Sequence, residues 1–201
     1  MVKKYDWMYQ MGGGKFEVAG RSDFSDAKTI HGIESISGSG YQTVSIRQPS
    51  AYRYIRYVSP VGGHVSILEF YDENGEKLQG TVTGTSGSNA KVFDDDVDTF
   101  FEAASDPSWV GLDLGEPRKI TKIRYLPRTD GHGIYEGHVY ELFYWNGDKW
   151  QSLGEKTADS HVLQYEVPEN ALFILKNITK NRTNKTPFVI EGGVQQWIQA
   201  D

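Results

Sequence analysis

The chain has 201 residues, a formal net charge of −6 and no cysteine. The negative charge argues against nucleic-acid partners and anionic membranes, because binding to either depends on concentrated Lys and Arg. The lack of cysteine excludes a disulfide framework, thiolate metal ligands and a cysteine nucleophile. A hydrophobic content of 38%, with 13% aromatic residues, is sufficient for a packed core.

The composition favours an all-β protein. Twenty-two glycines, seven prolines and twelve tyrosines suit a turn-rich β fold, and no amphipathic helix longer than a turn or two is evident. Residues 1–7 contain two lysines with no apolar run behind them. We therefore expect neither a signal peptide nor membrane insertion in this chain, and we expect a segment of a longer protein if the natural protein is exported.

The first part of the chain contains two predicted strands, residues 52–58 and 65–71. The strand pattern of 52–58 alternates with period two, and 65–71 is closed by the turn sequence Asp72–Gly75. The stretch Gly80–Ser88 is small, polar and glycine-rich. It predicts a domain boundary near residue 84, with a small β unit in residues 1–84 and a larger one in 85–201.

The second part has a stronger strand pattern. Short apolar segments are separated by turn signals every ten to fifteen residues, which favours an antiparallel jelly-roll sandwich. The predicted strands are 109–114, 119–127, 139–145, 149–153, 162–166, 171–177 and 187–197. Trp145 and Trp150 lie on the two arms of a predicted tight hairpin, close enough to pair.

The order of motifs in this part resembles one known family. An acidic turn, Asp94–Thr99, precedes a strand closed by Asp113–Gly115 and an alternating strand that ends at Pro127 and Arg128. This order is similar to that of discoidin domains, also called coagulation factor 5/8 type C domains, over about residues 85–197. Residues 1–84 resemble part of a similar domain.

The resemblance implies a galactose-binding-like β-sandwich that binds ligands without catalysis. The discoidin family includes many carbohydrate-binding modules of bacterial glycan-processing proteins. We therefore expect a non-enzymatic carbohydrate-binding accessory module of a larger secreted, periplasmic or cell-surface bacterial protein, with a glycan and neighbouring domains as partners. The alternative is a structural or protein-interaction sandwich without a sugar site. No catalytic arrangement stands out in the sequence. An unrecognised hydrolase activity is kept as a further alternative.

The acidic turn is the candidate metal site. Carboxylate, hydroxyl and carbonyl oxygens are the ligands that Ca²⁺ prefers. In similar modules the matching turn holds a structural Ca²⁺, which implies Asp94, Asp96, Thr99 and a distal Glu191 as ligands here. Asp95 stands where glycine is usual, and Asp tolerates the left-handed region better than most residues. The alternative is a solvated loop capped by its own backbone.

The loop that follows Pro127 is the candidate ligand site. Sugar recognition needs planar hydrogen-bonding groups and an aromatic face, and the loop supplies Arg128, Asp130, His132 and Tyr135. The resemblance implies Arg128 as a contact. The alternative for Arg128 is an ion pair with Asp130 or Glu136. A zinc site is disfavoured, because the loop lacks a clear third ligand.

Two further residues complete the predicted ligand site. Phe100 and Phe101 are adjacent, so an extended backbone directs one into the core and the other outward as a stacking platform, for which we select Phe101. Arg182 lies in a loop rich in Asn and Thr that borders the expected ligand end. We interpret its glycosylation sequons as loop composition.

Overall fold

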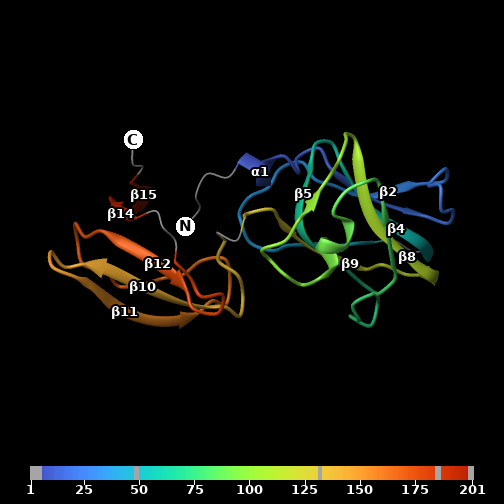
Figure 1. Ribbon diagram of the computed structural model, residues 1–201. Helices are drawn as coiled ribbons and strands as arrows, with labels where there is room; N and C mark the ends of the chain where they lie inside the picture. The colour runs from blue at the N-terminus through green and yellow to red at the C-terminus, as the bar shows by residue number, and fades with distance from the viewer. Residues whose placement is uncertain (1–5, 48–49, 131–132, 184–186, 199–201) are drawn as a thin grey trace. The chain divides into compact units, whose positions relative to one another are not determined.

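The computed structural model describes residues 6–47, 50–130, 133–183 and 187–198. They form two compact units, one within Lys4–Gly131 and the other within His132–Asp201. Both are built almost entirely of antiparallel strands (Figure 1), so the predicted all-β class is confirmed. We call them the N-terminal unit and the C-terminal unit. Within the described ranges, no helix is long and apolar enough to cross a membrane.

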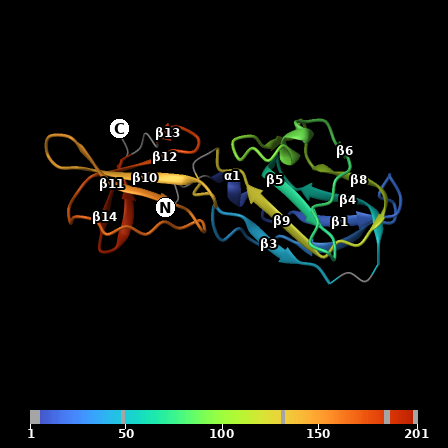
Figure 2. The same ribbon diagram turned by 90° about the horizontal axis from the view of Figure 1, so that it is seen from below.

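The N-terminal unit is a β-sandwich. Its elements are α1 (Asp6–Tyr9), β1 (Lys15–Ala19), β2 (Lys28–Gly32), β3 (Gln42–Ser45), β4 (Tyr52–Ser59), β5 (Gly63–Tyr71), β6 (Thr81–Gly84), the 3₁₀ helix η1 (Asn89–Phe93), β7 (Phe101–Glu102), β8 (Ser108–Arg118) and β9 (Lys122–Pro127). Among the described residues, the strands form two sheets, ordered β2-β1-β4-β8-β6 and β3-β9-β5-β7. Figure 2 shows both sheets from below.

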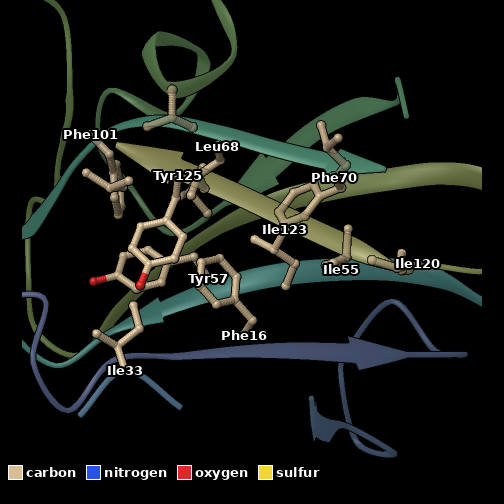
Figure 3. Close-up of a cluster of buried hydrophobic side chains, with 14 of the residues drawn as sticks. Phe16, Ile33, Ile55, Tyr57, Leu68, Phe70, Phe101, Ile120, Ile123 and Tyr125 are labelled. Carbon is tan, nitrogen blue, oxygen red and sulfur yellow. The ribbon is translucent and has the colours of Figure 1, made fainter. Parts of the chain in front are cut away.

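Aromatic side chains fill the space between the two sheets. Phe16 on β1 is fully buried, and its ring centroid lies 5.4 Å from that of Tyr57 on β4. The same ring lies 5.3 Å from Tyr125 on β9 and 6.3 Å from Phe70 on β5. Figure 3 shows these side chains pointing toward one another from opposite sheets. Burial of such large rings is the main stabilising contribution to this unit.

The expected boundary near residue 84 is wrong. β4 pairs with β8 and β5 pairs with β9, so strands from both sides of residue 84 share each sheet. The glycines that suggested a linker allow close packing instead. A Cβ on Gly80 would lie 2.4 Å from the Asp113 carbonyl oxygen, and one on Gly84 would lie 2.6 Å from that of Trp109. Glycine lets one backbone approach another closely, and here β6 lies against β8.

The C-terminal unit is the smaller one, so it follows the sandwich and does not precede it as expected. Its strands are β10 (Val139–Trp145), β11 (Trp150–Thr157), β12 (Phe173–Asn177), β13 (Arg182–Thr183), β14 (Phe188–Glu191) and β15 (Val194–Trp197). The described residues form one sheet ordered β11-β10-β12-β14-β15, with β13 paired to β12. Trp145 and Trp150 pair across the β10–β11 turn, as expected, with ring centroids 5.5 Å apart.

Two strand predictions in this unit are corrected. Residues 187–197 form two strands, β14 and β15, joined by a turn at Gly192 and Gly193, both at positive φ. Residues 162–166 form no strand. Leu163 and Tyr165 nevertheless pack, partly buried, against the apolar residues of the sheet. The segment therefore packs against the sheet through side chains, and it pairs with no strand among the described residues.

Candidate ligand site

Arg128 follows the last residue of β9 and is tightly held. Its Nε donates a hydrogen bond of 2.7 Å to Oδ1 of Asp130, so the ion pair that the sequence left open is formed with Asp130. Asp130 has a φ of 50°, a left-handed turn that Asp tolerates. The guanidinium carbon lies 3.6 Å from the ring centroid of Phe100. This contact and the ion pair fix the plane of the guanidinium group.

Trp7 and His64 complete the cluster. The Trp7 side chain is 41% exposed, and its ring centroid lies 5.0 Å from the guanidinium carbon of Arg128 and 5.1 Å from the centroid of His64. The His64 side chain is buried, and its Nδ1 has no hydrogen-bond partner among the described residues. Burial, and then the charge of Arg128, lowers the pKa of His64, which keeps the ring neutral at pH 7.

The arrangement offers the groups that sugar recognition requires. An exposed indole provides an apolar face for the C–H side of a pyranose ring. The Arg128 and Asp130 pair beside it provides a cationic donor group and an anionic acceptor group for hydroxyls. We call Trp7, His64, Phe100, Arg128 and Asp130 the aromatic–arginine cluster. All five belong to the N-terminal unit.

The other predicted ligand residues lie elsewhere. Phe101 is fully buried in the sandwich core, so its selection as the stacking platform is wrong, and Phe100 is the residue that faces outward to Arg128. Tyr135 is also buried, and its hydroxyl accepts a hydrogen bond of 3.1 Å from the Gly133 amide in the C-terminal unit. It is therefore structural. Arg182 is exposed in β13 of that unit, and His132 lies outside the described residues.

The acidic turn gathers several oxygen atoms around one hydroxyl. Oγ1 of Thr99 lies 2.8 Å from Oδ2 of Asp94, 2.9 Å from the Lys91 carbonyl oxygen and 3.2 Å from the Asp96 carbonyl oxygen. A hydroxyl has one proton and donates to one acceptor at a time. The cluster therefore has more oxygen atoms than protons to hydrogen-bond them. Carboxylate, carbonyl and hydroxyl oxygens are the ligands that Ca²⁺ prefers.

The remaining residues of the predicted metal site play different parts. Asp96 faces Thr99 through its carbonyl, while its Oδ1 accepts a hydrogen bond from the Asp98 amide. Asp95 adopts a φ of 58°, which is the left-handed conformation expected where glycine is usual, and forms an ion pair with Lys77. Glu191 ends β14 of the C-terminal unit. Three or more His, Asp or Glu side chains grouped as metal ligands are not found in the described part of the chain.

The sequence interpretation missed Trp7 and His64. Trp7 precedes the first strand and His64 lies in β5, so both are far from Arg128 along the chain. A signal was present in the sequence, because His64 follows the glycine pair Gly62–Gly63 and departs from the apolar pattern of its strand. Its proximity to Arg128 results from the pairing of β5 with β9, which brings the Arg128 amide to the His64 carbonyl oxygen at 3.0 Å.

The N-terminal unit is thus an antiparallel β-sandwich that carries an exposed aromatic ring beside an arginine–aspartate ion pair. The sequence model of the F5/8 type C domain family matches residues 78–191, more than half of the chain, and the chain belongs to this family. Domains of this type bind carbohydrates or other ligands and are generally non-catalytic. The matched range includes residues of both units and excludes β1–β5. No curated protein and no solved structure matches the chain significantly.

Proposed function

We propose that the N-terminal unit binds carbohydrate without catalysis through the aromatic–arginine cluster. The observation that carries the proposal is the 41% exposed Trp7 ring beside the Arg128 and Asp130 pair. The chain would serve as an accessory part of a larger secreted or surface bacterial protein and hold that protein on its glycan. The net charge of −6 favours a glycan over a polyanionic nucleic acid as the partner.

The first test uses Arg128. We expect Arg128→Ala to weaken glycan binding about ten- to a hundredfold, because losing a charged hydrogen-bonding partner costs about 1.5–3 kcal/mol. A glycan array on the intact chain identifies the ligand, and calorimetric titration of wild type and variant then measures the loss. If Arg128 serves only to hold its loop, the variant loses thermal stability and retains its affinity.

Trp7 provides a second test that leaves the ion pair intact. We expect Trp7→Ala to weaken binding of the same glycan about tenfold or more, because the apolar face of the site is removed. Tyr9→Ala is the matched control, since Tyr9 lies on the same short helix and is 51% exposed. Equal losses in the two variants, or none in either, would remove Trp7 from the site.

We propose in addition that the acidic turn binds a structural Ca²⁺ through oxygens of Lys91, Asp94, Asp96 and Thr99. The bound ion would provide positive charge that holds these oxygens together. We expect millimolar Ca²⁺ to raise the melting temperature relative to EDTA, because binding to the native state stabilises it by about 2.7 kcal/mol at a hundredfold excess over Kd.

Two variants test the ligands of this site. Asp94→Ala should abolish the Ca²⁺-dependent shift in melting temperature, because it removes the carboxylate that faces Thr99. Asp95→Asn is the control, since Asp95 pairs with Lys77 and Asn tolerates the same positive φ. Identical melting curves for the wild type in EDTA and in Ca²⁺ would rule out the site.

A further inference from the structure

A pocket lies wholly within the C-terminal unit. Its volume is about 600 Å³, within the range of about 300–1,000 Å³ that is typical of small-molecule sites. Apolar side chains from β10, β12 and β14 line it, and the segment Leu163–Val167 supplies further apolar side chains. The lining includes Ile134, Leu142, Leu163, Leu175, Phe188 and Ile190.

The pocket exists because the sheet has no second layer of strands in the described part of this unit. A sheet with one apolar face needs a covering element. Here the cover is the extended segment around Leu163 and Tyr165, which packs by its side chains. Two side-chain hydrogen bonds connect this segment to the sheet. Lys156 Nζ donates to the carbonyl oxygen of Gln164, and the Tyr165 hydroxyl donates to the carbonyl oxygen of Tyr140. So narrow a cover leaves part of the apolar face open.

One polar atom in the pocket lacks a partner. Gln195 on β15 lies opposite Ile190 on β14, and both residues line the pocket. Nε2 of Gln195 is buried and has no hydrogen-bond partner among the described residues. A buried amide without a partner is destabilising, so an acceptor oxygen placed there by a ligand would be stabilising.

The charges at the pocket disfavour an anionic ligand. Lys156 contributes a cation, but its ammonium group is engaged by the Gln164 carbonyl and lies 4.8 Å from the Tyr165 ring centroid. Glu166 also lines the pocket. Burial, followed by the charges of Glu141 and Glu155, raises the pKa of Tyr165. The site therefore has no excess of positive charge to hold a carboxylate.

We propose that this pocket binds an uncharged amphiphile, whose apolar chain or ring contacts the sheet face and whose single acceptor oxygen receives a hydrogen bond from Gln195. A medium-chain alcohol is the simplest molecule of this kind. The site is separate from the proposed carbohydrate site and does not depend on it.

The probe is 1-octanol, titrated into the isotopically labelled intact chain and followed by amide chemical shifts. We expect saturable shifts confined to residues that line the pocket, with a Kd below about 1 mM, and binding of octanoate at least about fivefold weaker. Absence of saturable shifts overturns the proposal. Octanoate binding as tight as that of octanol overturns the assignment to an uncharged ligand.

Adjacent glutamines on β15 provide a matched pair of variants. Gln195→Leu should raise the Kd for octanol about fivefold or more, because it removes the donor and keeps the side-chain volume. Gln196→Leu should leave the Kd within about twofold, since successive residues of a strand face opposite sides. Equal affinities in the two variants would contradict the role of Gln195.

Leu163→Trp tests the location independently of Gln195. Leu163 is half-buried on the covering segment, so a larger side chain there should occupy the pocket with little cost to the sheet. We expect octanol binding to weaken at least tenfold while the melting temperature is retained. Undiminished binding by this folded variant would place the ligand elsewhere and overturn the proposal.

Discussion

A fragment of residues 85–201 is expected to lack a folded sandwich, whereas a fragment of residues 1–131 is expected to unfold cooperatively. The reason is the loss of strand pairing. β8 would lose β4, and β9 would lose both β3 and β5. The core would lose Phe16, Tyr57 and Phe70, each fully buried. At about 1.5–3 kcal/mol for each buried side chain, the loss of these three alone is comparable with the roughly 5–15 kcal/mol by which most domains are stable.

Circular dichroism and thermal melting of the two fragments measure this effect. The fragment 1–131 should show a β spectrum and a single sharp transition, because it contains both sheets. The fragment 85–201 should show no transition attributable to β8 and β9. A well-dispersed amide spectrum for those strands in the second fragment would instead restore the boundary near residue 84.

Gly111→Ala is expected to destabilise the N-terminal unit by about 3 kcal/mol, at the upper end of the cost of overpacking. Gly111 lies on β8 opposite Arg56 of β4, in the middle of the five-stranded sheet of the described residues. A Cβ there would lie 2.0 Å from the Ile55 carbonyl oxygen and 2.7 Å from the Arg56 Cα. Both are backbone atoms, so relief requires movement of a central strand.

Gly32→Ala is the matched control for this substitution. Gly32 ends β2 at the edge of the same sheet, and a Cβ there would meet nothing within 4 Å. Chemical denaturation of both variants should therefore show a large loss of free energy of unfolding for Gly111→Ala and a change within about 0.5 kcal/mol for Gly32→Ala. Equal effects would show that β8 and β4 approach less closely than described.

Several features followed from short stretches of sequence. The strand predictions at 52–58, 65–71, 109–114 and 119–127 placed β4, β5, β8 and β9, because apolar runs closed by turn residues are local properties of the sequence. The left-handed conformation of Asp95 and the pairing of Arg128 with Asp130 also involve residues close in the chain. The family resemblance was carried by the same local motifs and is confirmed by the match over residues 78–191.

The partners of these strands could not be derived in the same way. Gly80 and Gly84 suggested a linker, since glycine favours flexible loops as well as close backbone contacts, and only the position of β8 distinguishes the two. Alternation required that either Phe100 or Phe101 be buried, but the register of β7 against β5 decided for Phe101. A strand was predicted at 162–166, but among the described residues no strand pairs with this segment.

The sequence by itself therefore determined the class of the fold, the family and the residue types available for binding. Only the tertiary structure decided the division into units at residues 131 and 132 and the meeting of Trp7, His64 and Arg128. The physical reason is the range of the interactions. Backbone conformation and side-chain alternation depend on neighbouring residues, whereas pairing between strands distant in the chain depends on which combination buries the apolar faces of all of them together.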